Sequence, residues 1–312
     1  MFTKMTREEK EARIKRDRPW MIFAVIAISA SAVFSALSAK AETLERARFT
    51  VEVVGQGPDV ILIPGLVSDR AVWADTVKSL SSSHRLHLVQ VRGFNGVPTG
   101  ANAEGPVLEP LVEDLNGYIR DKGLSRPVIV GHSMGGATGV MLSARHPQAV
   151  KQVVVVDSAP FMPALFNPAA TAESAKAQAG PMLKAVLAMP AEQFTAQQKM
   201  GMRMQTKDPA KADMVADWSV KSDRSVMVRA MEDLTSIDLR PELKHIKAKI
   251  TVLFAWDPMM QIPADAFQAR WEALYAGTPN LSVKRIDNSL HFIMFDQPAA
   301  FDAALRTALE DK

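Results

Sequence analysis

The sequence contains no cysteine. This absence excludes disulfide bonds, thiol catalysis and metal sites built on cysteine ligands, although it does not assign a cellular compartment. Internal repeats and low-complexity tracts are also missing. At 312 residues, 47% of them hydrophobic, the chain is long enough to bury a large core in one domain with room for an insertion.

The first 41 residues have a composition of their own. Basic residues are frequent up to position 19, and an apolar run from Trp20 to Leu37 follows that only serines interrupt. Ala39-Lys40-Ala41 then has the small-residue pattern of a cleavage site. We therefore predict a signal peptide over residues 1–41, removed after Ala41, and export to the periplasm or outside the cell. Because a run of 18 residues is just long enough to span a bilayer, an uncleaved N-terminal membrane anchor is the alternative.

The basic character of the chain comes mainly from this segment. The whole sequence carries 37 basic and 34 acidic residues. Residues 1–41 hold eight of the basic and four of the acidic ones, so the remainder keeps 29 and 30, a net charge of about −1. The sequence therefore gives no reason to expect nucleic acid as a partner, and we expect no stable membrane association once the signal peptide is removed.

Short apolar runs alternate with amphipathic segments along most of the remaining sequence. We predict an opening strand over residues 42–54. Further strands are predicted from the apolar runs at 60–63, 86–91, 127–130, 153–156, 250–254 and 281–286. Because helical patterns separate these runs, the sequence predicts an α/β fold with a doubly wound, mostly parallel sheet.

Residues 160–236 break this alternation, because they contain no strand-like run. Their pattern predicts several short helices, one of which ends near residue 179 while the next begins at Pro181. We therefore predict a helical cap over residues 160–236, inserted into an α/β core made of residues 42–159 and 237–312. Methionine is frequent in the cap, where it either fills the core or lines a pliable acyl pocket: Met182, Met189, Met200, Met202, Met204, Met214, Met227 and Met231.

One short segment carries the strongest chemical signal. Gly131-His132-Ser133-Met134-Gly135-Gly136 follows an apolar run and precedes a helical pattern of small residues. A serine at the apex of a sharp strand-to-helix turn is presented as a nucleophile, and the glycines two positions before and after it, Gly131 and Gly135, let strand and helix approach closely. We therefore predict that Ser133 is a nucleophile. The helix that follows points its N-terminus at the serine, so the backbone N–H of Met134 is a predicted oxyanion-hole donor.

A nucleophilic serine needs a base, and the base needs a carboxylate that fixes its tautomer. In open parallel sheets such residues gather at the carboxyl ends of the strands. Of the six histidines, only His291 falls in a loop just after the last predicted strand, so we predict it as the base. Asp257 follows the preceding strand and is the predicted acid. Asp157, at the end of the strand that follows the serine's helix, is the alternative acid.

The second oxyanion donor should come from the loop after the strand at residues 60–63. Leu66, one residue beyond Gly65, presents the backbone N–H that we predict for this role.

Taken together, five motifs resemble the α/β-hydrolase superfamily, in its serine-nucleophile, esterase-like form with a helical cap. The resemblance covers about residues 48–310. In chain order the motifs resemble the oxyanion loop, the turn after the next strand, the nucleophile elbow, the acid loop and the histidine loop: Leu62-Ile63-Pro64-Gly65, Arg92-Gly93-Phe94, Gly131 to Gly136, Phe254-Ala255-Trp256-Asp257 and Leu290-His291-Phe292.

The chain departs from the family pattern at two places. Gln90 stands where an aspartate is common, and Ala255-Trp256 stand where a glycine is common before the acid. Neither departure touches the predicted triad. The serine at position 133 argues against the family members that use an aspartate nucleophile, the epoxide hydrolases and haloalkane dehalogenases.

The residues and the resemblance together predict a serine hydrolase that cleaves a carboxylic ester, or a related acyl bond, through an acyl-enzyme. We expect a small-molecule acyl substrate with an apolar portion, and neither a metal nor an organic cofactor. The same triad could serve perhydrolysis, amide or C–C bond hydrolysis, or acyl transfer, and a non-catalytic binding protein on the same scaffold is a further alternative. The sequence decides neither the substrate nor the oligomeric state.

Overall fold

The computed structural model describes residues 42–310. The predicted signal peptide and the alternative membrane anchor, residues 1–41, lie outside the described part. Within that part, none of the helices combines the length and the hydropathy that a membrane span requires.

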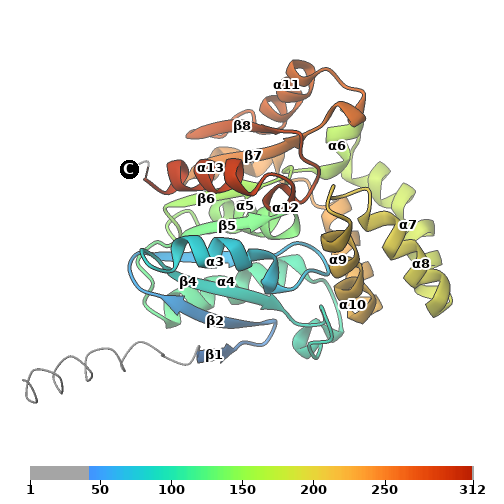
Figure 1. The fold of residues 1–312 in the computed structure, drawn as a ribbon, viewed down its shortest axis with the longest axis horizontal. Helices are drawn as coiled ribbons and strands as arrows, with labels where there is room; N and C mark the ends of the chain where they lie inside the picture. Colours follow the sequence, from blue (N-terminus) through green and yellow to red (C-terminus); the bar gives the residue numbers. More distant parts are fainter. Residues whose placement is uncertain (1–41, 311–312) are drawn as a thin grey trace, which may run out of the picture. The chain divides into compact units, whose positions relative to one another are not determined.

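A mixed sheet of eight strands forms the centre of residues 42–310 (Figure 1). Its spatial order is β1-β2-β4-β3-β5-β6-β7-β8. Strands β3 to β8 run parallel to one another, whereas β2 runs antiparallel to both β1 and β4. The predicted doubly wound, mostly parallel sheet is thus confirmed. The strands are β1 (Glu42–Glu45), β2 (Phe49–Gly55), β3 (Asp59–Ile63), β4 (Arg85–Val91), β5 (Val128–His132), β6 (Gln152–Val156), β7 (Lys249–Trp256) and β8 (Leu281–Asp287).

The strand predicted over residues 42–54 is two strands joined by a tight turn. The backbone N–H of Arg46 donates to the carbonyl of Phe49 at 2.9 Å, and the Arg46 guanidinium forms ion pairs with Asp114 and Asp121. The two ion pairs join segments far apart in the sequence, so strand periodicity alone does not reveal the turn.

Helices cover both faces of the sheet. Figure 1 shows α3 (Ala74–Leu80) and α13 (Pro298–Glu310) in front of it and α4 (Leu108–Asp121) behind it. The apolar residues of α4 at positions 108, 111, 112 and 115 recur at helical spacing and are buried, so hydrophobic burial fixes which face of α4 meets the core. The remaining helices of this core are η1 (Arg70–Trp73), η2 (Gly100–Ala103), α5 (Met134–Arg145), η4 (Pro258–Met260), α11 (Ala264–Leu274) and α12 (Ile293–Asp296).

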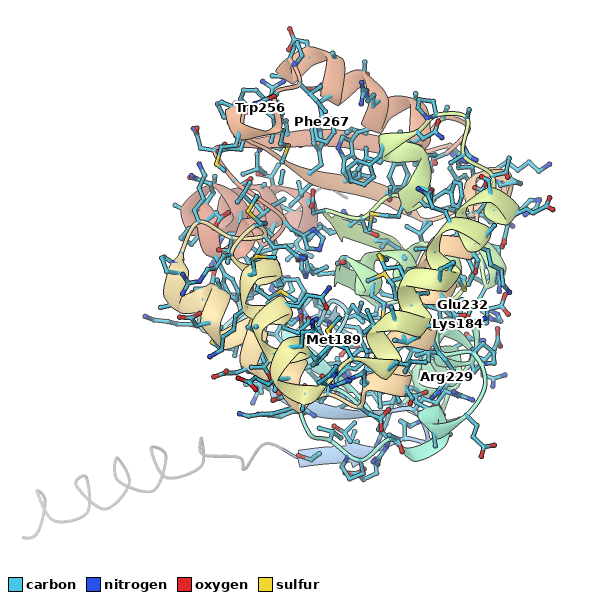
Figure 2. All side chains as sticks on the ribbon, turned by 90° about the vertical axis from the view of Figure 1, so that its right-hand side faces the viewer. Lys184, Met189, Arg229, Glu232, Trp256 and Phe267 are labelled. Atoms are coloured by element: carbon cyan, nitrogen blue, oxygen red, sulfur yellow. The ribbon has the colours of Figure 1, made fainter. Side chains whose placement is uncertain are left out.

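Between β6 and β7 the chain forms helices only. They are α6 (Met162–Phe166), α7 (Ala172–Ala188), α8 (Ala191–Met202), α9 (Pro209–Lys221), α10 (Arg224–Ser236) and η3 (Arg240–His245). Helices α7 and α10 pack on each other, as do α8 and α9. Figure 2 shows them in front of the sheet, with Lys184 and Met189 on the near side. We call α6 to α10 and their connections the cap.

The structure shows why the cap helices begin where they do. Thr171, Asp208 and Asp223 precede α7, α9 and α10, and each side chain accepts a hydrogen bond from a backbone N–H in the first turn. The predicted break near Pro181 is wrong, because α7 continues through this proline. A proline inside a helix removes one hydrogen bond, and α7 packs on α10 along this continuous helix.

One carboxylate of the cap reaches into the core. Asp233 on α10 accepts hydrogen bonds from the N–H groups of Val107 and Leu108, at 2.7 and 2.9 Å, where α4 begins. The first N–H groups of a helix have no acceptor inside the helix, so this carboxylate caps α4 and also ties the cap to the core.

Candidate active site

Ser133 occupies a strained turn between β5 and α5. Its backbone has φ 51° and ψ −117°, which a residue with a side chain rarely adopts. The N–H of Ser133 donates to the carbonyl of Val156 at 2.9 Å, so the neighbouring strand β6 holds the turn in place. Strain of this kind persists only where the surroundings enforce it, and it is concentrated at functional sites.

The two glycines that flank the turn are required by space. A Cβ atom on Gly131 would lie 2.2 Å from the carbonyl oxygen of Gly135. A Cβ atom on Gly135 would lie 2.2 Å from the carbonyl oxygen of Ile63. Because both obstacles are backbone atoms of packed elements, neither position accommodates a larger residue without moving a strand or the helix.

The loop after β8 brings His291 to the same edge of the sheet. Its Nδ1 lies 2.7 Å from the carboxylate oxygen Oδ2 of Asp157, and the other oxygen, Oδ1, accepts the N–H of Ala255 at 2.9 Å. A carboxylate can only accept, so Nδ1 of His291 carries the proton and Nε2 is left as the basic nitrogen. The alternative acid, Asp157, therefore makes the contact that was expected of Asp257.

Asp257 has a different set of partners. Its carboxylate is buried, forms an ion pair with Lys207 of the cap and accepts the N–H of Met259 at 2.9 Å. The Lys207 ammonium lowers the pKa of Asp257. The choice of Asp257 as the partner of His291 is corrected on this geometry. The physical reason is the strand order: β6 lies between β5 and β7, so the end of β6 is one strand closer to Ser133.

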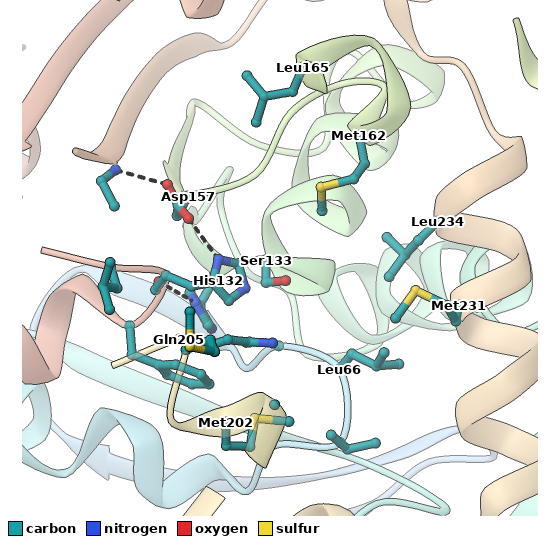
Figure 3. Close-up of a pocket in the computed structure, with 18 of the residues that line it drawn as sticks. Leu66, His132, Ser133, Asp157, Met162, Leu165, Met202, Gln205, Met231 and Leu234 are labelled. Carbon is teal, nitrogen blue, oxygen red and sulfur yellow. Dashed lines mark hydrogen bonds and ion pairs between the residues drawn. The ribbon is translucent and has the colours of Figure 1, made fainter. Parts of the chain in front are cut away.

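The predicted oxyanion donors flank the serine. Met134 is the first residue of α5, so its N–H has no acceptor within the helix. Leu66 lines the same cavity as Ser133, and Figure 3 shows both beside the open space. The loop that carries Leu66 approaches the turn closely, since a Cβ atom on Gly65 would lie 3.2 Å from Cβ of Ser133. The role of the two N–H groups stays a prediction.

His132 takes part in the site in a way the sequence did not suggest. Its ring is fully buried, with its centroid 4.6 Å from that of His291. Its Nε2 donates to the carbonyl oxygen of His291 at 2.9 Å. Burial lowers the pKa of His132 well below its usual value, so this histidine is neutral and supports the loop that carries His291. No sequence signal indicates this contact.

A cavity of about 800 Å³ opens in front of Ser133 (Figure 3). Ser133, Asp157 and His291 lie on its wall together with residues from the core and the cap. Most of the wall is apolar, and within residues 42–310 neither lysine nor arginine contributes to it. Five of the eight methionines noted in the cap line the cavity, and this position agrees with the alternative that cap methionines line a pocket: Met182, Met202, Met204, Met227 and Met231.

Within the described chain, Ser133 Oγ has no hydrogen-bond partner. The structure therefore brings serine, histidine and aspartate to one cavity and pairs the last two. In structures without substrate, catalytic hydrogen bonds are often long and tighten only in the complex. A doubly wound sheet with a strained serine turn and a histidine–aspartate pair at one edge defines the α/β-hydrolase class.

Comparison with known proteins agrees with this class. A model of the alpha/beta hydrolase family matches residues 60–304. The pimeloyl-[acyl-carrier protein] methyl ester esterase of Aeromonas hydrophila is 31% identical over 152 residues, which are 49% of this chain and 58% of that protein. The enzyme of the same name from Vibrio cholerae is 25% identical over 203 residues, covering 65% of this chain and 77% of that protein.

A solved structure of a hydrolase from Pseudomonas aeruginosa is similar in fold. It has a TM-score of 0.68 and 18% identity, and the match covers 88% of this chain and 99% of that one. The match to the Aeromonas relative spans less than two thirds of that protein's length. The chain belongs to the alpha/beta hydrolase family, and the two relatives named above are esterases.

Proposed function

We propose that this enzyme hydrolyses carboxylic esters through an acyl-enzyme formed on Ser133. The observation that carries the proposal is the pair of His291 and Asp157, 2.7 Å apart, on the wall of the cavity into which the strained Ser133 turn opens. The esterase names of the two relatives support the same reaction class.

In this mechanism Nε2 of His291 takes the proton of the Ser133 hydroxyl as Oγ attacks the ester carbonyl carbon. The imidazolium that forms is stabilised by the Asp157 carboxylate on Nδ1. The N–H groups of Leu66 and Met134 donate to the oxyanion of the tetrahedral intermediate. His291 then returns the proton to the leaving alcohol, and a water molecule, activated by the same nitrogen, releases the carboxylic acid and restores the serine.

The cavity wall supports an apolar substrate. Most of its side chains are apolar, with leucine, methionine and aromatic residues prominent among them, and burial of each methylene in such a wall contributes about 0.8 kcal/mol. Without a lysine or arginine on the described part of the wall, an acyl chain that ends in a carboxylate would bury an unpaired charge. We propose esters with neutral, apolar acyl chains as the substrate class.

The proposal extends to the place where the enzyme acts. The basic start, the apolar run and the small residues before position 42 support export from the cytoplasm. Fractionation of the producing cells, with the N-terminal residue of the recovered protein determined, tests this: the proposal expects exported protein that begins at residue 42, and full-length protein in the cytoplasm contradicts it.

A panel of substrates tests the reaction. Wild-type enzyme and the Ser133→Ala variant are compared on p-nitrophenyl esters, on matched p-nitroanilides, on a β-diketone and on an ester with hydrogen peroxide as the acceptor. The proposal expects ester hydrolysis as the fastest reaction and its loss in Ser133→Ala. Faster turnover of the anilide, the diketone or the peroxide assigns one of the alternative reactions, and absence of all turnover in folded protein favours a binding protein.

A further inference from the structure

Asp296 connects the histidine loop to the cap. It is the last residue of α12, five positions after His291. Its Oδ2 accepts the backbone N–H of Leu290 at 2.7 Å. Its Oδ1 accepts the hydroxyl of Thr206 at 2.6 Å and the backbone N–H of Lys207 at 2.8 Å. One carboxylate thus binds the residue before His291 and two residues of the cap.

A second hydrogen bond joins the same two segments on the other side of His291. The backbone N–H of Phe292 donates to the carbonyl of Gln205 at 3.0 Å. We call residues 205–207, which connect α8 to α9, the cap turn. Both backbone neighbours of His291 are therefore held by the cap turn, directly at Phe292 and through Asp296 at Leu290.

The position of the imidazole depends on these contacts. Asp157 holds Nδ1, and His132 holds the carbonyl of the peptide group that joins His291 to Phe292, but neither binds the N–H groups of Leu290 and Phe292. A displacement of about 1 Å at a reacting group costs up to about 10²-fold in rate, because proton transfer needs the donor and the acceptor within hydrogen-bond distance. The chemistry itself does not use Asp296, whose contacts are with backbone groups and one hydroxyl.

We propose that Asp296 is a positioning residue, which aligns His291 with Ser133 by tying the histidine loop to the cap turn. The inference rests on the proposed function. A consequence is that the seating of the cap and the alignment of the base are coupled, because both depend on one carboxylate.

The test compares Asp296→Ala with Asp302→Ala. Asp302 on α13 bonds Arg306 and Ser79, away from the cavity, and so controls for the loss of a carboxylate in the C-terminal segment. Each variant is assayed on p-nitrophenyl butyrate, with kcat expressed per active site titrated to completion with a fluorophosphonate. We expect kcat of Asp296→Ala to fall about 10- to 100-fold with KM changed less than about threefold, and kcat of Asp302→Ala to match wild type.

A milder substitution keeps the test decisive if Asp296→Ala folds poorly. Thr206→Val removes the hydroxyl bond to Asp296, together with the longer bond of 3.3 Å in which the same oxygen accepts the N–H of Asp208. It should lower kcat about two- to fivefold. Combined with Asp296→Asn, its effect should shrink, because the two residues act through one contact. If Asp296→Ala or Thr206→Val has a lowered melting temperature but keeps the wild-type kcat per titrated site, the inference is overturned. Retained activity in Ser133→Ala would overturn the proposed function instead.

Discussion

The choice between Asp157 and Asp257 can be decided by two matched asparagine substitutions. In Asp157→Asn, the amide oxygen can still accept the N–H of Ala255, which leaves the amide NH₂ group facing Nδ1 of His291. Nδ1 must then become an acceptor, which places the proton on Nε2, where it prevents the ring from acting as a base. Enforcing the wrong tautomer of a catalytic histidine costs about 10⁴-fold in kcat, or about 5 kcal/mol of transition-state stabilisation.

Asp257→Asn provides the control, because it removes a buried charge at the end of β7, the strand next to β6. The variant loses the ion pair with Lys207, whose side chain is 40% exposed, so we expect about 1 kcal/mol of lost stability. Its kcat should fall by no more than about tenfold, since the carboxylate has no contact with His291. Both variants are assayed on p-nitrophenyl butyrate, with circular dichroism as the measure of folding. A loss in folded Asp257→Asn that equals or exceeds the loss in Asp157→Asn refutes the assignment of Asp157.

Three further predictions follow from the elbow, the cavity and a buried histidine. Gly135→Ala places a methyl group 2.2 Å from the carbonyl oxygen of Ile63 and should cost about 3 kcal/mol of stability. Gly201→Ala, in an open helical position, is the control and should be neutral or stabilising. Equal melting temperatures for the two variants would contradict the close contact between Gly135 and Ile63. Along p-nitrophenyl esters from acetate to octanoate, kcat/KM should rise by up to about fourfold per methylene until the cavity is filled. An ester whose equally long acyl chain ends in a carboxylate should be a poor substrate. Equal kcat/KM values along the series, or a preference for the carboxylate-ended chain, would contradict an apolar acyl site. Burial lowers the pKa of His87 in the folded protein. Below about pH 6.5 the unfolded chain therefore binds more protons at this residue than the folded one. The free energy of unfolding should then decrease by up to about 1.4 kcal/mol for each pH unit of acidification. His87→Gln should flatten that slope in urea titrations between pH 7 and 5, and an unchanged slope shows that other groups cause it.

The sequence was sufficient for the features that local chemistry fixes. Apolar runs such as Val153 to Val156 predict strands because a strand covered on both faces has no polar side to show. Ser133 is identifiable because glycines stand two positions before and after it. Backbone oxygens lie so close to these two positions that a side chain does not fit. The assignment of His291 to the same cavity follows from its place after the last strand.

The features that the sequence could not provide depend on spatial neighbours. Asp157 and Asp257 both follow buried strands, and only the strand order shows which one lies next to the serine. Asp296 has no motif that predicts its role, because its partners are backbone groups that the fold brings together. The helix through Pro181 and the turn at Arg46 likewise depend on packing and on ion pairs between distant segments.

Covalent labelling of Ser133 is the most direct test of the mechanism. Wild-type enzyme is treated with a fluorophosphonate, digested and mapped by mass spectrometry, and the experiment is repeated with Ser133→Ala and with wild type protected by an excess of an ester substrate. We expect one phosphonyl adduct per chain, on the peptide that contains Ser133, slowed by the substrate and absent from the variant. Folded wild-type protein that hydrolyses esters but carries no adduct, or carries it on another residue, would contradict the assignment of Ser133 as the nucleophile.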